Sequence, residues 1–227
     1  MTPIPIAILG ANGKMGKRLI ELCTLDPKFK IAGTCARGDC PSQALLPCAV
    51  AIDFSHASAT LEYLSAAVAL KKPLVLGTTG HDTHMLEEIQ KAAKSIPILF
   101  SSNFSFGIDF CKQTALKLAQ SLGGAAQIHI IETHHITKKD SPSGTALAIA
   151  KAADFENKGN IPIHSIREAN VIGEHRIFFE WGNERIEIKH EALSRDAFAQ
   201  GALTGAVFLI DKEPGLYTGN EFSQKKF

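Results

Sequence analysis

The first hundred residues alternate short apolar stretches with longer amphipathic ones, and this alternation restricts the fold more than any other feature of the sequence. Apolar strands separated by amphipathic helices predict a parallel sheet that is covered on both faces. The order of the elements predicts an α/β, Rossmann-like doubly wound fold. Strands are expected at 4–9, 31–35, 49–54, 73–76 and 96–100, and helices at 14–25, 57–70 and 82–94.

After about residue 105 the pattern changes to that of a smaller α+β domain. Gly182-Asn183 separates two alternating stretches and indicates a two-residue hairpin. We therefore expect a mixed or antiparallel sheet with one polar face, unless a partner covers that face. Extended stretches are expected at 127–131, 161–166, 171–172, 176–181 and 184–190, and helices at 107–122, 144–155 and 198–210.

The chain is long enough, at 227 residues, for two modest domains. We expect residues 1–105 and 209–227 to form a dinucleotide-binding domain, and residues 106–208 a domain for substrate binding and oligomerisation. The net charge of +1 gives no basic field for nucleic acid or for an anionic membrane. Five cysteines without CxxC spacing, and the lack of a signal-peptide pattern, favour reduced thiols and a cytoplasmic location.

A glycine-rich turn follows the first expected strand and begins the first expected helix. Glycines at such a turn let a pyrophosphate approach the backbone N–H groups at the positive end of the helix. The spacing is GxxGxxG, which meets the usual GxGxxG pattern only loosely. Its place in an α/β lobe nevertheless favours a dinucleotide site over a simple turn. The residues are Gly10, Ala11, Asn12, Gly13, Lys14, Met15 and Gly16.

Arg37 follows the second expected strand, where NAD-specific sites usually carry a carboxylate. An arginine favours the 2′-phosphate of NADPH through a charge-assisted hydrogen bond. Asp39 is an alternative ribose contact if it bends back, and Arg37 could also be a solvated loop residue. NADPH is the favoured cofactor, and NADH stays possible.

Two polar stretches end the fourth and fifth expected strands, where ligands of open α/β sheets bind. Both suit a nicotinamide carboxamide and a ribose, although turns of this composition also occur for structural reasons. The stretches contain Gly77, Thr78 and Thr79, and Ser101, Ser102, Asn103 and Phe104.

Residues 131–146 combine adjacent histidines, a lysine and the start of an alanine-rich helix. Histidine titrates near neutrality, lysine carries a mobile cation, and a helix start offers unpaired N–H groups. Each of His134, His135 and Lys138 alone is more simply a surface residue, but the combination indicates proton transfer beside an anion site. A metal site on His129, His134 and His135 is not expected, because we find no carboxylate or cysteine at ligand spacing.

Taken together, these motifs resemble the dihydrodipicolinate reductase family, whose members are also called 4-hydroxy-tetrahydrodipicolinate reductases. The resemblance covers nearly the whole chain. It includes the GxxGxMG turn, GTTG, NFSxG and HHxxKxDxPSGTA, followed by Arg167 and Gly173-Glu174-His175, Ser194-Arg195, and Lys212-Glu213 with Gly215-Leu216-Tyr217.

The resemblance implies an NAD(P)H-dependent oxidoreductase that reduces 4-hydroxy-tetrahydrodipicolinate with loss of water, in lysine and diaminopimelate biosynthesis. It implies that Lys138 is the principal proton donor and that His134 relays or supplies a proton. It also implies a homotetramer built on the sheet of the second domain. The substrate carboxylates would bind His135, Ser143, Gly144 and Thr145, and the cofactor would bind Gly10 through Met15, Arg37, Gly77–Thr79 and Ser101–Phe104.

Two other functions are considered. An aspartate dehydrogenase would share the glycine turn but not the Lys-Asp-Ser-Pro-Ser-Gly-Thr string, and a non-catalytic NADPH sensor would not need a donor pair. The chain departs from the family in the short segment after Arg37, in Ala169, and in the tail at 218–222, whose packing on the first domain is therefore in question.

Overall fold

The structure, a computed structural model, describes residues 2–156, 159 and 161–219. The chain forms two compact units: the first contains residues 1–104 and 198–227, and the second contains residues 105–197. Among the described residues, no helix combines the length and the apolar character needed to cross a membrane.

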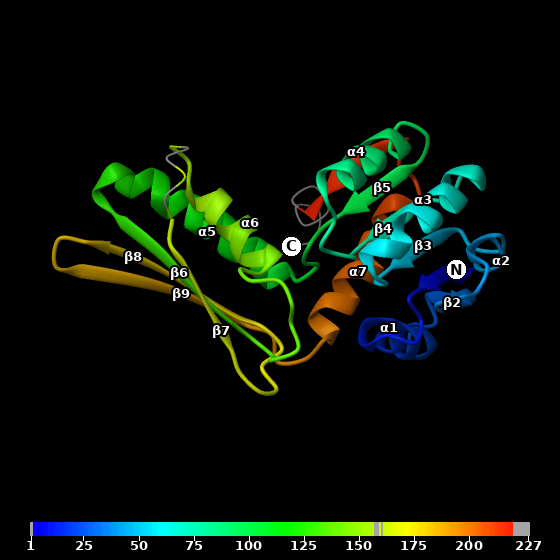
Figure 1. The fold of residues 1–227 in the computed structure, drawn as a ribbon, viewed down its shortest axis with the longest axis horizontal. Coiled ribbons are helices and arrows are strands. Elements are labelled where there is room, and N and C mark those ends of the chain that lie inside the picture. The colour runs from blue at the N-terminus through cyan, green and yellow to red at the C-terminus, as the bar shows by residue number, and fades with distance from the viewer. Residues whose placement is uncertain (1, 157–158, 160, 220–227) are drawn as a thin grey trace. The chain divides into compact units, whose positions relative to one another are not determined.

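The first unit contains a six-stranded parallel sheet in the order β10-β5-β4-β3-β1-β2 (Figure 1). Its strands are β1 (Ile4–Leu9), β2 (Phe29–Cys35), β3 (Val50–Asp53), β4 (Leu74–Leu76), β5 (Pro97–Phe100) and β10 (Gly215–Thr218). Its helices are α1 (Lys14–Leu25), α2 (Pro41–Leu45), the 3-10 helix η1 (Ala57–Ala59), α3 (Thr60–Ala69), α4 (Thr83–Ala92) and most of α7 (Asp196–Leu209).

Helices cover both faces of this sheet, which confirms the doubly wound fold. Residues of α2, α3 and α4 share one buried cluster with strand residues such as Leu9, Leu76 and Ile98. On the opposite face, Gly205 of α7 packs against the side chain of Leu99. The sheet order reverses between β1 and β3, and the carboxyl ends of these strands mark the usual ligand crevice of such folds.

The helix and strand boundaries follow the sequence closely in this unit, with two exceptions. The five-residue helix α2 was not expected, because it is too short to show helical periodicity. The strand β10 was not expected either; it pairs in parallel with β5 and completes the sheet. Residues 220–222 of the questioned tail lie outside the described residues.

The division into units differs from the expected domain boundary at residue 209. Residues 198–208 were expected in the second domain, but they belong to the first unit. The physical reason is close packing of α7. A Cβ atom on Gly201 would lie 1.8 Å from the carbonyl oxygen of Phe104.

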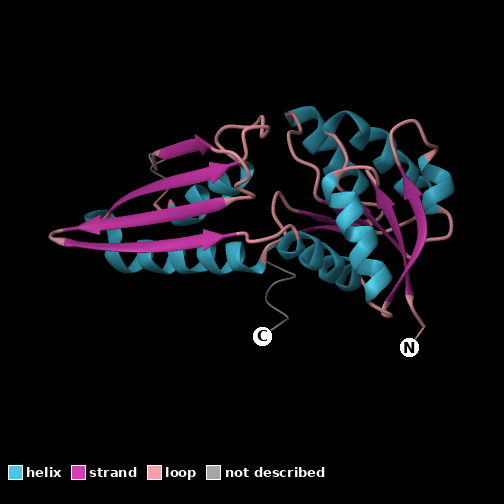
Figure 2. Ribbon diagram, turned by 90° about the horizontal axis from the view of Figure 1, so that it is seen from below, coloured by secondary structure: helices cyan, strands magenta, loops and turns pink. Residues whose placement is uncertain are grey.

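The second unit contains a mixed four-stranded sheet in the order β7-β6-β8-β9, in which only β6 and β7 are parallel. Helices lie along one face of this sheet, as Figure 2 shows. The strands are β6 (Gln127–His134), β7 (Ile163–Arg167), β8 (Glu174–Trp181) and β9 (Glu184–Glu191), and the helices are α5 (Phe106–Leu122), η2 (Gly123–Ala125) and α6 (Gly144–Ala153).

The expected hairpin is confirmed, since Gly182-Asn183 joins β8 to β9 and Gly182 has a φ of 53°. The expected extended stretch at 171–172 was wrong, because no strand forms there. Strand β6 continues three residues further than expected and ends at His134. This extension places a catalytic candidate on the strand itself.

Candidate active site

His134 is the last residue of β6, and the residue is 7% exposed. Its Nδ1 atom makes a hydrogen bond with the carboxylate of Glu132, two residues earlier on the same face of the strand. Burial lowers the pKa of His134, and although Glu132 opposes this effect, the pKa stays below its ordinary value. His134 is therefore mainly neutral at pH 7.

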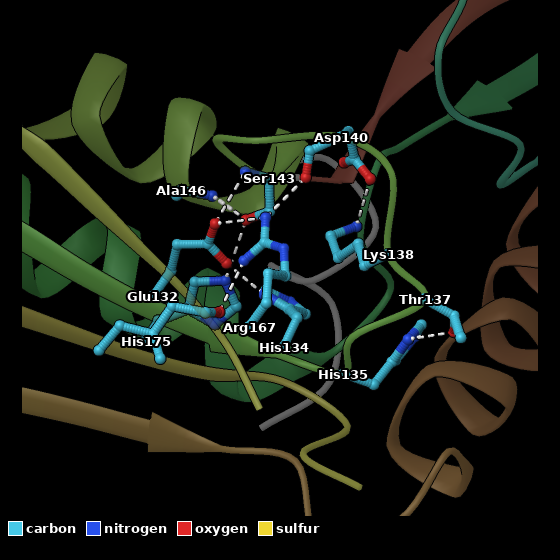
Figure 3. Close-up of polar contacts among 11 residues, drawn as sticks. Glu132, His134, His135, Thr137, Lys138, Asp140, Ser143, Ala146, Arg167 and His175 are labelled. Carbon is cyan, nitrogen blue, oxygen red and sulfur yellow. Dashed lines mark hydrogen bonds and ion pairs between the residues drawn. The ribbon is translucent and has the colours of Figure 1, made fainter. Parts of the chain in front are cut away.

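Glu132 is fully buried, and protein groups contact both of its carboxylate oxygens. Its Oε1 atom accepts hydrogen bonds from Arg167 Nη2 at 3.0 Å and from the backbone N–H of Ser143 at 3.3 Å (Figure 3). Burial acts to raise the pKa of the Glu132 carboxyl, but the hydrogen bonds, above all that from Arg167, outweigh burial and lower it. Glu132 is therefore a buried anion, with Arg167 and the Ser143 N–H on one oxygen and His134 on the other.

Lys138 lies in the loop between β6 and α6, with its ammonium group 2.9 Å from Asp140 Oδ1. Burial acts to raise the pKa of Asp140, but the contact with Lys138 and a hydrogen bond from the backbone N–H of Gly144 lower it below its usual range. Arg167 Nη2 also donates to the carbonyl oxygen of Asp140 at 2.7 Å. These contacts hold the Lys138 ammonium near the start of α6.

Ser143 caps α6, since its Oγ atom accepts a hydrogen bond from the N–H of Ala146 at 3.1 Å. Ser143 and Thr145 are almost fully buried. Helix α6 begins directly after the loop that carries Lys138. Its first turn therefore brings backbone N–H groups and the positive end of the helix dipole close to that loop.

The adjacent histidines point in different directions, as neighbouring residues at the end of a strand do (Figure 3). His135 lies apart from Glu132, and its Nδ1 atom is 2.7 Å from the hydroxyl of Thr137. The two imidazoles therefore belong to different surroundings.

Two further histidines, His175 and His190, lie beside this cluster. The resemblance included His175 in the Gly173-Glu174-His175 segment, but no role was expected for either histidine. Register places Glu132 opposite His175, and His175 opposite His190. Burial is the main cause that lowers the pKa of His175 to about 3, so this ring is neutral. Only the pairing of β6, β8 and β9 brings these residues together; their sequence spacing gives no such signal.

Glu132, His134 and His175 have the composition of a zinc site, with ligand atoms within 4.8 Å of one another. The statement that no carboxylate lies at ligand spacing was therefore wrong for Glu132. However, Glu132 already bonds to the guanidinium of Arg167, which disfavours a second cation, and His129 faces the other side of the sheet. We assign no metal to this cluster.

A cavity of about 600 Å³ in the first unit opens beyond the carboxyl ends of β1, β2 and β3. Gly10, with a φ of 80°, lies so close to the next loop that a Cβ atom would be 2.8 Å from the carbonyl oxygen of Phe54. Of the expected cofactor residues, Gly10, Asn12, Gly13 and Arg37 line this cavity.

The other expected cofactor residues do not line this cavity. Phe104 is a core residue, 1% exposed, whose ring packs edge-on against Phe54. Thr78 is also buried, close to Asp53 at the end of β3. Burial raises the pKa of Asp53 to about 6, although Ser55, whose backbone N–H donates to Asp53 Oδ1 at 2.8 Å, opposes it. The remaining residues lie in the turns after β1, β4 and β5 or in the first turn of α1; they are Ala11, Lys14, Met15, Gly77, Thr79, Ser101, Ser102 and Asn103.

Both units of the chain match known proteins of the same family. Residues 4–104 match the family model described as "Dihydrodipicolinate reductase, N-terminus", and residues 107–222 match "Dihydrodipicolinate reductase, C-terminus". The 4-hydroxy-tetrahydrodipicolinate reductase of Akkermansia muciniphila is 41% identical, over 95% of this chain and 96% of that protein. The enzyme of Alkaliphilus oremlandii is 38% identical, over 94% and 95% of the two chains.

Solved structures show the same fold at lower identity. A dipicolinate-bound dihydrodipicolinate reductase from Paenisporosarcina matches with a TM-score of 0.76 and 20% identity, over 99% of this chain and 100% of that chain. An aspartate dehydrogenase from Thermotoga maritima has a TM-score of 0.53 and 13% identity, over 92% and 98%, and shares only the fold. The two family models and the full-length relatives show that the chain belongs to the dihydrodipicolinate reductase family.

Proposed function

We propose that the second unit binds the cyclic dicarboxylate substrate between Lys138 and the start of α6. The chain is an NAD(P)H-dependent oxidoreductase that reduces 4-hydroxy-tetrahydrodipicolinate to tetrahydrodipicolinate with loss of water, in lysine and diaminopimelate biosynthesis. The observation that supports the proposed site best is the Lys138 ammonium, held 2.9 Å from Asp140 beside the first turn of α6.

The ring hydroxyl leaves as water together with a hydrogen of the neighbouring ring carbon, and the reduction adds a hydride and a proton to the conjugated ring that results. In the proposed mechanism, Lys138 stabilises negative charge that develops on the ring and donates the proton, with His134 as a relay. Lys138 is only partly buried, so it can exchange its Asp140 contact for the substrate and regain a proton from water.

The substrate carboxylates require donors once water is excluded. We assign this role to the N–H group of Gly144, which would exchange Asp140 for the substrate, and to the N–H group and hydroxyl of Thr145, with His135 at the edge of the site. Ser143 contributes by fixing the helix start, because its hydroxyl already accepts from Ala146.

The cavity of the first unit fits a dinucleotide. Gly10 has no side chain, so a ligand in the cavity can approach its backbone, and Arg37 supplies a cation. Bound NADPH or NADH supplies the hydride. We favour NADPH, because the Asp39 carboxylate accepts from the N–H of Ala36 at 2.8 Å and is thus committed to its own loop. Arg37 is then the residue that selects a 2′-phosphate. The turns after β4 and β5, at 77–79 and 101–104, are proposed to complete the nicotinamide end.

We also propose a homotetramer in which other copies cover the helix-free face of the second unit's sheet. On this face His129 stacks on Phe178, with ring centroids 4.6 Å apart, and Arg176 and Arg185 lie over the same ring. Light scattering should give about four times the 24.4 kDa of one chain. Because the described cysteines are free thiols, the proposed location is the cytoplasm.

An absorbance assay at the nicotinamide band tests the activity, with the substrate generated in situ by a coupled synthase. The reductase should consume reduced nicotinamide only when the synthase product is present, and faster with NADPH than with NADH at limiting cofactor. Oxidation that instead depends on ammonia and oxaloacetate would indicate an aspartate dehydrogenase.

A further inference from the structure

We propose that Glu132 is a positioning residue whose buried carboxylate fixes which nitrogen of His134 carries the proton and joins that histidine to the start of α6. The proposal rests on the proposed function only in giving His134 a role in proton handling. The contacts of Glu132 stand independently of that role.

The tautomer of His134 follows from the chemistry of the contact. An ionised carboxylate only accepts hydrogen bonds, so Nδ1 of His134 must donate to Glu132 Oε2. Neutral His134 therefore carries its lone pair on Nε2. Gly173 lies on that side of the ring, where even a Cβ atom would be 3.1 Å from Nε2. A glycine at 173 keeps a side chain off the nitrogen that can exchange a proton.

Burial, with help from the cations around His134, explains why the pair with Glu132 does not keep His134 protonated. Lys138 and Arg167 face it from the loop and from β7, and His175 of β8 lies beside it with ring centroids 5.1 Å apart. His190 of β9 lies beyond His175, with ring centroids 6.3 Å apart. Arg167 balances the charge of Glu132 at 3.0 Å, while the two other histidines have pKa values lowered by burial and stay neutral. His134 is thus oriented by a carboxylate without being permanently charged by it.

The same carboxylate also positions the proposed anion site. Glu132 Oε1 accepts from the backbone N–H of Ser143, the residue that caps α6. One buried side chain therefore sets both the proton-exchanging nitrogen and the helix start that would bind the substrate carboxylate. A structural role alone would not require the second oxygen to contact His134.

The test is the substitution Glu132→Gln in the full chain with ¹⁵N-labelled histidine. The amide oxygen should face the two donors, Arg167 and the Ser143 N–H, so the amide NH₂ must face Nδ1 of His134. Long-range ¹H–¹⁵N spectra should show the proton on Nδ1 in the wild type and on Nε2 in the variant. The signals are assigned by their loss in His134→Gln.

The variant should also show a His134 titration at lower pH, because the carboxylate charge that favours the imidazolium is lost. The value of kcat should fall about 10- to 100-fold, with little change in the KM for NADPH. Glu88→Gln is the matched control, because it removes an ion pair on α4 in which Lys91 Nζ lies 2.6 Å from Glu88 Oε1. This variant should change neither the titration of His134 nor kcat.

Two results would overturn the proposal. One is a wild-type His134 whose neutral form carries its proton on Nε2. The other is a Glu132→Gln protein that loses activity and stability while the tautomer and titration of His134 stay unchanged, as a purely structural residue would behave. If the variant does not fold, the wild-type tautomer alone decides. Normal rates in His134→Gln would instead refute the proposed role of His134 and leave the Glu132 contact standing.

Discussion

The ammonium of Lys138 lies in a polar loop, paired with Asp140, and its neighbour Lys139 is exposed. This difference gives a matched pair of substitutions. Lys138→Ala should lower kcat by ~10²–10⁴ because the ring loses its proton donor, while Lys139→Ala should stay near the wild-type rate. The KM for NADPH should not change in either variant. Equal rates for the two variants in the coupled assay would refute the role of Lys138.

Arg37 follows strand β2 and lines the cavity of the first unit. It is the proposed contact for a 2′-phosphate. Arg37→Ala should raise the KM for NADPH about tenfold or more, because a charge-assisted hydrogen bond is lost, and should affect NADH far less. Arg18→Ala on α1, outside this cavity, is the control. Equal losses for the two cofactors in parallel titrations would remove the argument for NADPH.

At this scale, sequence reasoning could find His134 and Lys138 because they lie within one dense string. It could not identify Glu132 as the partner of His134, since a single carboxylate two residues before a histidine is common. His175 and His190 lie 41 and 56 residues after His134, and strand pairing, which the sequence does not reveal, brings them to the site. Helix caps and turns could be predicted from neighbouring residues in the sequence, but contacts between strands could not.

The close packing of helix α7 determines that residues 198–208 belong to the first unit. Its glycines allow close packing on β5 and on the residues that follow β5. Gly201→Ala should lower the free energy of unfolding by roughly 1–3 kcal/mol, because the added methyl group meets a backbone carbonyl that cannot move away easily. Urea denaturation of the full chain measures this, with Gln200→Ala on the exposed side as control. A variant as stable as the wild type would show that the packing at Gly201 is loose.

Most elements could be predicted because each long segment has one clear periodicity. The expected helix at 14–25 has the same bounds as α1. The helix expected to begin at Asp82 does so with Asp82 as its cap, since the N–H of Met85 donates to the Asp82 carboxylate at 2.8 Å. The short elements α2 and β10 were missed, since four or five residues contain too little pattern and β10 depends on a partner strand far away in sequence.

Across the whole molecule, buried neutral histidines make stability depend on pH. The pKa of His175 is about 3 when folded and 6.5 ordinarily, so the unfolded chain binds a proton at a higher pH than the folded one. Its contribution is complete above pH 6.5 and is lost as the pH falls toward 3. The wild type should therefore lose about 1.4 kcal/mol of unfolding free energy per pH unit below 6.5 from this residue.

His175→Gln should flatten that slope between pH 6.5 and 4.5, measured as unfolding free energy in urea. Asp53, with its pKa raised to about 6, acts in the opposite direction, but it is present in both proteins and cancels in the comparison. His84→Gln, on an exposed position of α4, is the control. An unchanged slope in His175→Gln would mean that His175 titrates normally in the folded protein.

The most direct test is a crystal structure with bound dipicolinate, a planar dicarboxylate analogue of the substrate. We predict that one carboxylate accepts hydrogen bonds from the N–H groups of Gly144 and Thr145, with the ammonium of Lys138 within about 3.5 Å of the ligand. Dipicolinate bound elsewhere, or Lys138 directed into solvent away from the ligand, would contradict the proposed site.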